Sequence, residues 1–301
     1  MIRNLLTSSG CLNFRKYSTA LMRGVSSNLP KALSSNSFAQ QEIDITTAIQ
    51  QHDAYYELLK SIVTNIIHLE ASDEYPDCVF IEDAAVAVDN KVVITNIGAD
   101  SRKGEVDAVQ ECLEKMNMDV YDMRVEANDD ATCDGGDVLY PVHWDGSTKL
   151  GGKHMFVGIS SRTNQKGFEY LCKVFHELEV IPVHMANISN ALHLKSITTH
   201  LDHSTLIMPT GRCGDELIRA MKATEKGYTV IRLPDIKACN IVSVNGHVIA
   251  QKCISDESKM ILEREVVSKR GMKLYYMDSS EFAKCDGALT CKSILLNLKL
   301  S

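Results

Sequence analysis

The sequence predicts an α/β protein in which a strand–strand–helix–strand unit recurs around a closed ring. After a basic N-terminal stretch, short apolar runs typical of strands alternate with amphipathic segments typical of helices. This order recurs four times, at intervals of roughly 40–60 residues, and a fifth copy is divided between the two ends of the chain. Joining those ends in one unit would remove exposed sheet edges, which favours a ring. Periodicity alone leaves an α/β sandwich of irregular order as the alternative.

Hydrophobic spacing defines four complete units. The first is expected to contain strands 78–88 and 91–95, helix 103–118 and strand 119–124. The second contains strands 137–142 and 154–159, helix 164–178 and strand 180–184. The third contains strands 192–199 and 205–208, helix 215–225 and strand 228–233. The fourth contains strands 240–244 and 247–251, helix 257–269 and strand 273–277.

The fifth unit is predicted to be split. The last apolar run, 291–296, reads as a strand with no helix after it. The N-terminal part of the chain offers the missing pieces, which are a strand near 20–23, a helix within 42–67 and a strand at 66–70. The two ends of the chain are therefore expected to complete one unit.

Composition narrows the class of protein. The 301 residues carry a formal charge of −7, which argues against nucleic-acid binding and suits a small cationic substrate. No run of 18 apolar residues exists, so we expect no membrane span. The ten cysteines form no Cys-x-x-Cys pair, which argues against a structural zinc site and for reduced thiols in an intracellular compartment. The composition leaves the oligomeric state open.

The N-terminal stretch differs from the rest of the chain. The first 41 residues contain no Asp or Glu, and arginines and lysines are spread among many serines. This composition is typical of a mitochondrial transit peptide, and a basic tail is the alternative. Residues 1–17 are therefore interpreted as an extension and 18–301 as a single catalytic domain, in mitochondria or the cytoplasm.

Four polar segments fall at corresponding places, near the first strand of a unit. They contain Glu82 and Asp83, Asp134, His193 and Cys291. If equivalent strand ends converge on a ring axis, a thiol, an imidazole and several carboxylates meet in one pocket as nucleophile, proton shuttle and cation-binding groups. Taken singly, Cys291 reads as a buried apolar thiol, His193 as a structural histidine and the Asp134 segment as a turn. A purely structural role is harder to assign to the adjacent carboxylates Glu82 and Asp83. One of two neighbouring strand residues must point inward, where an unpaired charge is costly.

At these segments the chain resembles dimethylarginine dimethylaminohydrolases, of the guanidino-group-modifying superfamily that also contains arginine deiminases and amidinotransferases. The matching stretches keep their order over about residues 18–301; they are 76–83, 98–106, 134–139, 156–167, 192–196 and 286–295. The resemblance implies a five-fold pseudo-symmetric α/β propeller.

The resemblance also implies roles for individual residues. Cys291 falls on the nucleophile, His193 on the general acid/base and Asp134 on the carboxylate that orients the histidine. The implied substrate-binding residues are the acidic Asp77, Glu82 and Asp83, the carboxylate-binding Arg102 and Arg162, and backbone carbonyls near Cys285 and Leu33. It implies no required metal or cofactor.

The implied chemistry agrees with these residue types. A guanidinium stays protonated and needs carboxylate acceptors, and arginine is a natural bidentate partner for an α-carboxylate. The expected reaction hydrolyses asymmetric dimethylarginine or monomethylarginine to citrulline and the free amine through a covalent thiouronium. Deimination of arginine, amidino transfer and a non-catalytic binding propeller are the alternatives.

Two features depart from the family. The segment 141–153, which contains the single tryptophan Trp144, is longer than the family's turn and reads as a surface hairpin or a partner contact. Lys292 follows the nucleophile where some relatives have a second cysteine. Strand alternation would direct its side chain away from the thiol, so we expect little effect on the chemistry.

Overall fold

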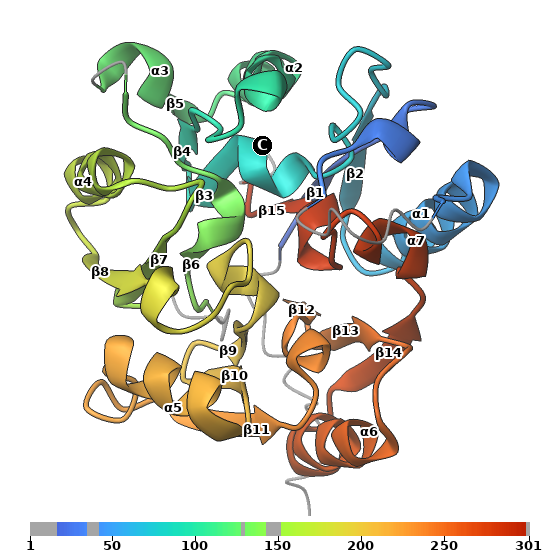
Figure 1. The fold of residues 1–301 in the computed structure, drawn as a ribbon, viewed down its shortest axis with the longest axis vertical. Helices are drawn as coiled ribbons and strands as arrows, with labels where there is room; N and C mark the ends of the chain where they lie inside the picture. The colour runs from blue at the N-terminus through green and yellow to red at the C-terminus, as the bar shows by residue number, and fades with distance from the viewer. Residues whose placement is uncertain (1–16, 35–41, 128–129, 143–151, 299–301) are drawn as a thin grey trace, which may run out of the picture.

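Five three-stranded sheets are arranged in a ring in the computed structural model (Figure 1). The structure describes residues 17–34, 42–127, 130–142, 152–298. The first strands of the units lie around the centre of the ring and the long helices around its rim (Figure 1). The expected five-fold α/β propeller is confirmed. Residues 1–16 and 143–151, which hold most of the expected extension and most of the long hairpin with Trp144, lie outside the described residues.

Every sheet has the same plan. The middle strand pairs antiparallel with the first strand and parallel with the third. A parallel pair needs a crossover connection, and in each unit a helix supplies it. The strand–strand–helix–strand order inferred from hydrophobic spacing is therefore the repeating unit of the fold.

The first two units follow this plan closely. The first contains β3 (Ala85–Val88), β4 (Lys91–Ile94), α2 (Val106–Lys115) and β5 (Asp119–Asp122). The second contains β6 (Val138–Leu139), β7 (His154–Ile159), α4 (Gln165–Val174) and β8 (Glu179–His184). The short helix α3 (Met123–Glu126) joins them.

The third and fourth units repeat it. The third contains β9 (Thr199–Asp202), β10 (Thr205–Pro209), α5 (Gly211–Ala220) and β11 (Thr229–Leu233). The fourth contains β12 (Val242–Val244), β13 (His247–Gln251), α6 (Asp256–Leu262), which continues as the π-helical segment η8 (Glu263–Ser268), and β14 (Lys273–Met277).

The fifth unit is split as expected. It contains β15 (Ile294–Leu296), β1 (Thr19–Arg23), α1 (Ile45–Lys60) and β2 (Asn65–Leu69). The apolar side chains of this unit pack on both neighbours: Leu21 lies in a cluster with Val92, and Tyr55 lies in a cluster with Ile249. The ring is therefore closed by packing as well as by strand pairing.

A short 3₁₀ turn precedes the first strand of every unit, and in four of the units this turn overlaps residues that the sequence predicted as strand. These turns are η2 (Ile81–Ala84), η4 (Gly135–Asp137), η6 (Leu194–Ser196), η7 (Ile236–Cys239) and η9 (Thr290–Lys292). The predicted strands at 78–88, 137–142, 192–199 and 291–296 therefore begin too early. Their apolar residues are buried as expected, but the polar residues among them bond across the ring, a tertiary effect that local periodicity does not contain.

The remaining elements are short. They are η1 (Leu29–Lys31), η3 (Asp100–Glu105), η5 (Met185–Asn187) and α7 (Ser280–Ala283). Of the helices in the described part of the chain, none is long and apolar enough to cross a membrane.

Candidate active site

The 3₁₀ turns bring the expected site residues together at one end of the ring. Glu82 and Asp83 lie in η2, Asp134 and His193 immediately precede η4 and η6, and Cys291 lies in η9. One pocket is lined by eight of the ten expected residues: Leu33, Asp77, Asp83, Arg102, Arg162, His193, Cys285 and Cys291. Of the other two, Asp134 bonds to His193 in the pocket wall, and Glu82 lines a second cavity together with Lys195 and Thr290.

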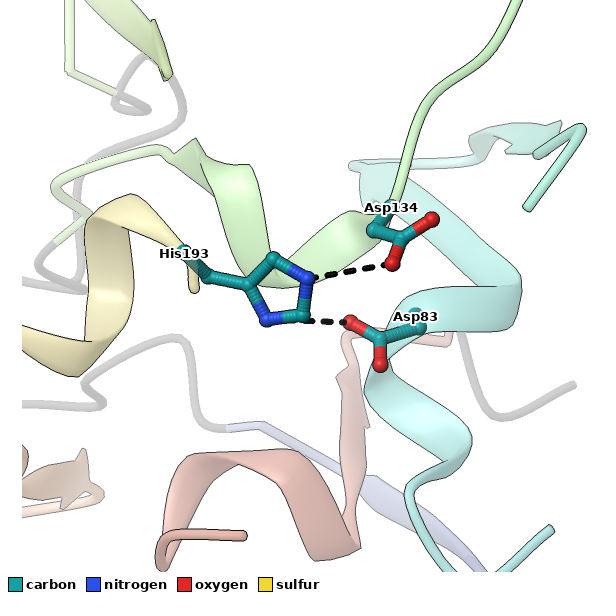
Figure 2. Close-up of side chains that lie close together, drawn as sticks. All are labelled: Asp83, Asp134 and His193. Carbon is teal, nitrogen blue, oxygen red and sulfur yellow. Dashed lines mark hydrogen bonds and ion pairs between the residues drawn. The ribbon is translucent and has the colours of Figure 1, made fainter. Parts of the chain in front are cut away.

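His193 is held between two carboxylates (Figure 2). Its Nε2 lies 3.0 Å from Asp134 Oδ2, and its Nδ1 lies 3.9 Å from Asp83 Oδ1. Burial opposes a positive charge on the ring, but Asp83, together with Asp134 and Asp137, raises the pKa of His193 to about 9. The imidazole is therefore protonated at neutral pH and can donate a proton.

Backbone donors fix the two carboxylates. Gly98 N–H donates to Asp134 Oδ1 at 2.7 Å, and Gly136 N–H donates to Asp83 Oδ1 at 2.9 Å. A β-carbon on Gly136 would lie 2.6 Å from His193 Nδ1 and 2.8 Å from Asp83 Oδ1. The sequence predicted a turn at the Gly-Gly pair. The absence of a side chain there leaves room for the Asp83 carboxylate and the His193 imidazole to approach each other.

Asp137 is a further buried carboxylate whose charge acts on His193. It is fully buried and accepts hydrogen bonds from Leu194 N–H at 2.9 Å, Ser160 Oγ at 2.6 Å and Thr163 Oγ1 at 2.7 Å. Burial raises the pKa of this carboxyl to about 6, although the histidine and the two hydroxyls oppose the rise. The bond to Leu194 N–H anchors the turn that follows His193. The sequence placed Asp137 in one of the four polar segments and at the start of a strand, but it was not predicted as a site residue.

Arg102 is buried and bound to carboxylates of the protein. Its Nη1 donates to Asp83 Oδ2 at 2.8 Å, and its Nε and Nη2 contact the Glu105 carboxylate, the latter at 2.8 Å. Arg162 makes no side-chain hydrogen bond or ion pair within the described part of the chain. The two arginines of the expected carboxylate-binding pair therefore differ: one holds Asp83 in place and the other is available to a ligand.

Cys291 is a buried thiol at the end of this pocket. Burial first, and then the charges of Glu82 and Asp83, raise its pKa to about 12, while Lys195 opposes the rise. The cysteine is a neutral thiol at physiological pH when the pocket holds no cation. A positive charge bound near Glu82 and Asp83 would cancel the two carboxylate charges that oppose its ionisation.

Glu82 is buried and bonded to Lys195 and Thr290. Its Oε1 is 2.7 Å from Lys195 Nζ, and its Oε2 accepts from Thr290 Oγ1 at 2.9 Å. Burial raises the pKa of Glu82, while Lys195 opposes the rise. The expectation that one of the two adjacent carboxylates must point inward is met by both residues, which lie on a 3₁₀ turn rather than a strand and are both buried. Lys195 was not recognised from the sequence, although it lies two residues after His193.

Asp77, Leu33 and Cys285 form the outer wall. Leu33 N–H lies 3.2 and 3.3 Å from the two oxygens of Asp77, so this backbone segment is tied to the acidic residue. Burial raises the pKa of Asp77, against the nearby arginines. The Cys285 thiol donates to Phe282 O at 3.3 Å, and burial raises its pKa to about 12.

Lys292 is fully buried behind Cys291. Its Nζ donates to Ser279 Oγ at 3.0 Å and lies 4.8 and 4.7 Å from the ring centroids of Tyr55 and Phe282. Two aromatic faces and a hydroxyl thus surround the ammonium group. Burial lowers the pKa of Lys292 to about 7.

The buried trio Asp83, Asp134 and His193 is close enough to be considered as a metal site, with ligand atoms within 4.8 Å of one another. The carboxylate oxygens already accept from Arg102, two backbone N–H groups and the histidine. The raised pKa of His193 also favours a proton over a metal on the ring. The donor set fits a hydrogen-bonded imidazolium better than a metal ion.

Comparison with known proteins identifies the family. The family model of eukaryotic N,N dimethylarginine dimethylhydrolases matches residues 29–269. The chain belongs to this family. It is 26% identical to the N(G),N(G)-dimethylarginine dimethylaminohydrolase of Pseudomonas aeruginosa over 253 residues, 83% of this chain and 89% of that one. It is 28% identical to the protein of the same name from Streptomyces coelicolor over 277 residues, 92% of this chain and 96% of that one.

A solved structure of the dimethylaminohydrolase family has the same fold. The Pseudomonas aeruginosa protein, as a cysteine-to-serine mutant complexed with citrulline, superposes with a TM-score of 0.76 at 24% identity, covering 93% of this chain and 99% of that one. The five-bladed α/β propeller is thus shared with this dimethylaminohydrolase.

Proposed function

We propose that the protein hydrolyses Nω-methylated arginines, asymmetric dimethylarginine and monomethylarginine, to citrulline and dimethylamine or methylamine. One observation carries the proposal: the Cys291 thiol and the charged His193 imidazole line one pocket with Asp77 and Asp83. These are a nucleophile, a proton donor and acceptors for a guanidinium. Family membership and the citrulline bound to the Pseudomonas aeruginosa protein support the substrate class.

Binding of the substrate prepares the nucleophile. The carboxylates of Asp77, Glu82 and Asp83 receive the guanidinium, and Arg162 receives the α-carboxylate. The bound cation offsets the negative field that raises the pKa of Cys291 to about 12, and the thiol releases its proton to solvent. The catalytic thiolate therefore forms when the substrate is present.

The reaction then has two halves. The Cys291 sulfur attacks the guanidinium carbon, the carbon–nitrogen bond to the methylated nitrogen breaks, and His193 donates its proton to the departing amine. A covalent thiouronium remains on the sulfur. His193, now neutral, takes a proton from water, and the water oxygen attacks the same carbon. The carbon–sulfur bond then breaks and the remaining hydroxyl proton leaves to solvent, which gives citrulline and the thiolate. Asp134 keeps the imidazole oriented in both halves. No step uses a metal or cofactor.

The test is turnover of three substrates. Purified protein is given asymmetric dimethylarginine, monomethylarginine and arginine, and citrulline and released amine are measured together. We expect both methylated substrates to be hydrolysed with equal amounts of citrulline and amine. Faster turnover of arginine would assign the protein as a deiminase, and no turnover of either methylated substrate contradicts the proposal.

Variants identify the nucleophile. Cys291→Ser should lower kcat by at least about 10³-fold, because a hydroxyl without a strong adjacent base is a poor nucleophile. Cys253→Ser, which replaces an exposed thiol of the fourth unit, should keep full activity. Iodoacetamide should inactivate the wild type by modifying Cys291, and substrate should protect it. Inactivation through Cys78 or Cys285 would contradict the assignment.

A further inference from the structure

The fourth unit contributes none of the expected site residues, yet its 3₁₀ turn also ends at the ring centre. The residue that follows this turn is Asn240, which is buried. Like Glu82, Asp83, Asp134, His193 and Cys291 in the other four units, it lies in or next to the 3₁₀ turn that precedes the unit's first strand. Asn240 is therefore the side chain that the fourth unit places toward the site.

Asn240 holds the turn that carries Cys291. Its Oδ1 accepts from Leu289 N–H at 3.0 Å and from Thr290 N–H at 3.2 Å. These N–H groups open η9, and the first donors of a helical turn have no partner within the turn itself. The amide oxygen thus supplies the acceptor that fixes the turn directly before the thiol.

The Asn240 amide nitrogen extends this contact to Glu82. Its Nδ2 donates to Lys195 O and to Thr290 Oγ1, each at 3.0 Å. Thr290 Oγ1 in turn donates to Glu82 Oε2, and Lys195 Nζ contacts Glu82 Oε1. These four residues form a closed ring of hydrogen bonds that joins four of the five units.

We propose that Asn240 is a positioning residue that fixes the Cys291 nucleophile relative to Glu82, the carboxylate proposed to face the guanidinium. The inference rests on the proposed function, and it extends it to a residue that touches neither substrate nor thiol. The amide group suits this place because it combines an acceptor for two backbone N–H groups with donors for a carbonyl and a hydroxyl. A carboxylate would keep the acceptor and lose both donors.

The kinetic test uses Asn240→Ala and Asn240→Asp. A misplaced reacting atom lowers the rate of the chemical step more than binding, so Asn240→Ala should lower kcat about 10- to 100-fold and change KM by less than about threefold. Asn240→Asp should retain more kcat than Asn240→Ala, because the acceptor for Leu289 and Thr290 remains. Equal losses in the two variants, or a kcat within about twofold of the wild type in both, would overturn the proposal.

The matched control is Asn245→Ala in the β12–β13 turn. Asn245 also bonds backbone groups with both ends of its amide, to Tyr17 N and O and to Ile62 O. Its loss should lower thermal stability and leave kcat unchanged. Thr290→Val tests the hydrogen-bonded ring formed by Asn240, Thr290, Glu82 and Lys195. The double variant that also carries Asn240→Ala should have a kcat only slightly below that of the worse single variant, since both residues belong to one network. Losses that multiply fully would contradict a shared network.

Alkylation separates this inference from the proposed function. The rate at which iodoacetamide modifies Cys291 is measured against pH without substrate, by mass spectrometry of the modified peptide. Asn240→Asp adds a negative charge near the thiol and should shift the midpoint of alkylation to higher pH, whereas Asn245→Ala should not shift it. If no methylarginine is turned over but this shift is seen, the proposed function fails and the positioning role stands. An unchanged midpoint of alkylation in Asn240→Asp would contradict the positioning role.

Discussion

At the scale of single residues, the charge of His193 is the property on which the proposed chemistry depends. The imidazole of His193 lies between the Asp83 and Asp134 carboxylates, and its pKa of about 9 is well above the usual value of 6.5. A histidine of ordinary pKa would be mostly neutral at pH 7.5 and could not protonate the departing amine. The arrangement therefore keeps the proposed proton donor protonated before the proposed thiolate forms.

The first prediction concerns the alkaline limb of activity. Because the proposed first half-reaction needs protonated His193, kcat/KM should fall as the pH rises through about 9. Asp83→Asn removes a negative charge that stabilises the imidazolium, so the midpoint of the fall should move about 1–2 pH units lower. The measurement is kcat/KM for monomethylarginine between pH 6 and pH 10. Asp202→Asn, in a β9 residue of the third unit, is the control, and an unchanged midpoint in Asp83→Asn would contradict the assignment.

The second prediction concerns Lys292, which has a partner hydroxyl and two aromatic faces but no carboxylate within ion-pair distance among the described residues. Burial lowers its pKa to about 7, whereas the unfolded chain keeps the usual 10.5. Between those values the unfolded state binds more protons, so stability rises with pH from about 7 to about 10.

Lys292→Met should remove this rise and stabilise the protein at pH 6 by about 1–4 kcal/mol. The free energy of unfolding of the wild type and of Lys292→Met is measured by urea unfolding at pH 6, 7.5 and 9. The control is Lys259→Met, in the partly exposed helix α6. A lower stability for Lys292→Met at pH 6 would show that the aromatic faces more than offset the loss of hydration.

At the scale of elements, the 3₁₀ turns decide the geometry of the site. A strand directs successive side chains to opposite faces, whereas a tight turn can direct neighbouring carboxylates such as Glu82 and Asp83 into one buried region. The Gly135–Gly136 turn opposite them leaves space for His193. The site therefore depends on irregular structure held at the end of regular strands.

Gly136→Ala tests that dependence. The added methyl would lie 2.6 Å from His193 Nδ1 and must push the imidazole away. We expect kcat to fall at least about 10-fold with the fold retained, since the proton donor is displaced. The control is Gly246→Ala: this glycine has φ 79° with nothing within 4 Å of the added methyl, so it should lose stability through strain and keep its activity. Equal kcat in Gly136→Ala and the wild type would show that the space is not needed.

The limits of sequence reasoning appear in these same elements. Strands such as β7, β13 and β14 were predicted with the bounds that the structure has, because their hydrophobic pattern is local. The predicted starts of the first strands were wrong, because the residues before these strands form 3₁₀ turns. A turn with buried carboxylates is stabilised by partners in other units, which the local sequence does not show. Asn240 gave no signal at all: its four hydrogen bonds reach residues 45 to 50 positions away. Convergence of the site residues was predictable from the repeat, and their hydrogen-bond partners were not.

At the scale of the whole molecule, the ring is closed by two distant parts of the chain. β1 pairs with β15, Ser18 N–H donates to Leu296 O at 2.9 Å, and Leu298 N–H donates to Ser18 Oγ at 2.8 Å. The two ends of the split unit thus lie side by side. Because β15 directly follows the turn that carries Cys291, this closure also supports the position of the proposed nucleophile.

The last prediction is that the propeller folds and stays active when the chain termini are moved to another connection. In a circular permutant, a short Gly/Ser linker joins residue 298 to residue 17, and new ends are made between Glu225 and Lys226, in the connection from α5 to β11. The linker replaces the non-covalent junction of the split unit, so we expect a cooperative unfolding transition and a kcat within about threefold of the control, since such exposed connections tolerate new ends. The control is the unpermuted chain of residues 17–298, which separates permutation from the loss of the flanking residues. A permutant that unfolds without cooperativity while this control folds would show that the order of the units along the chain, and not only their closure, determines the fold.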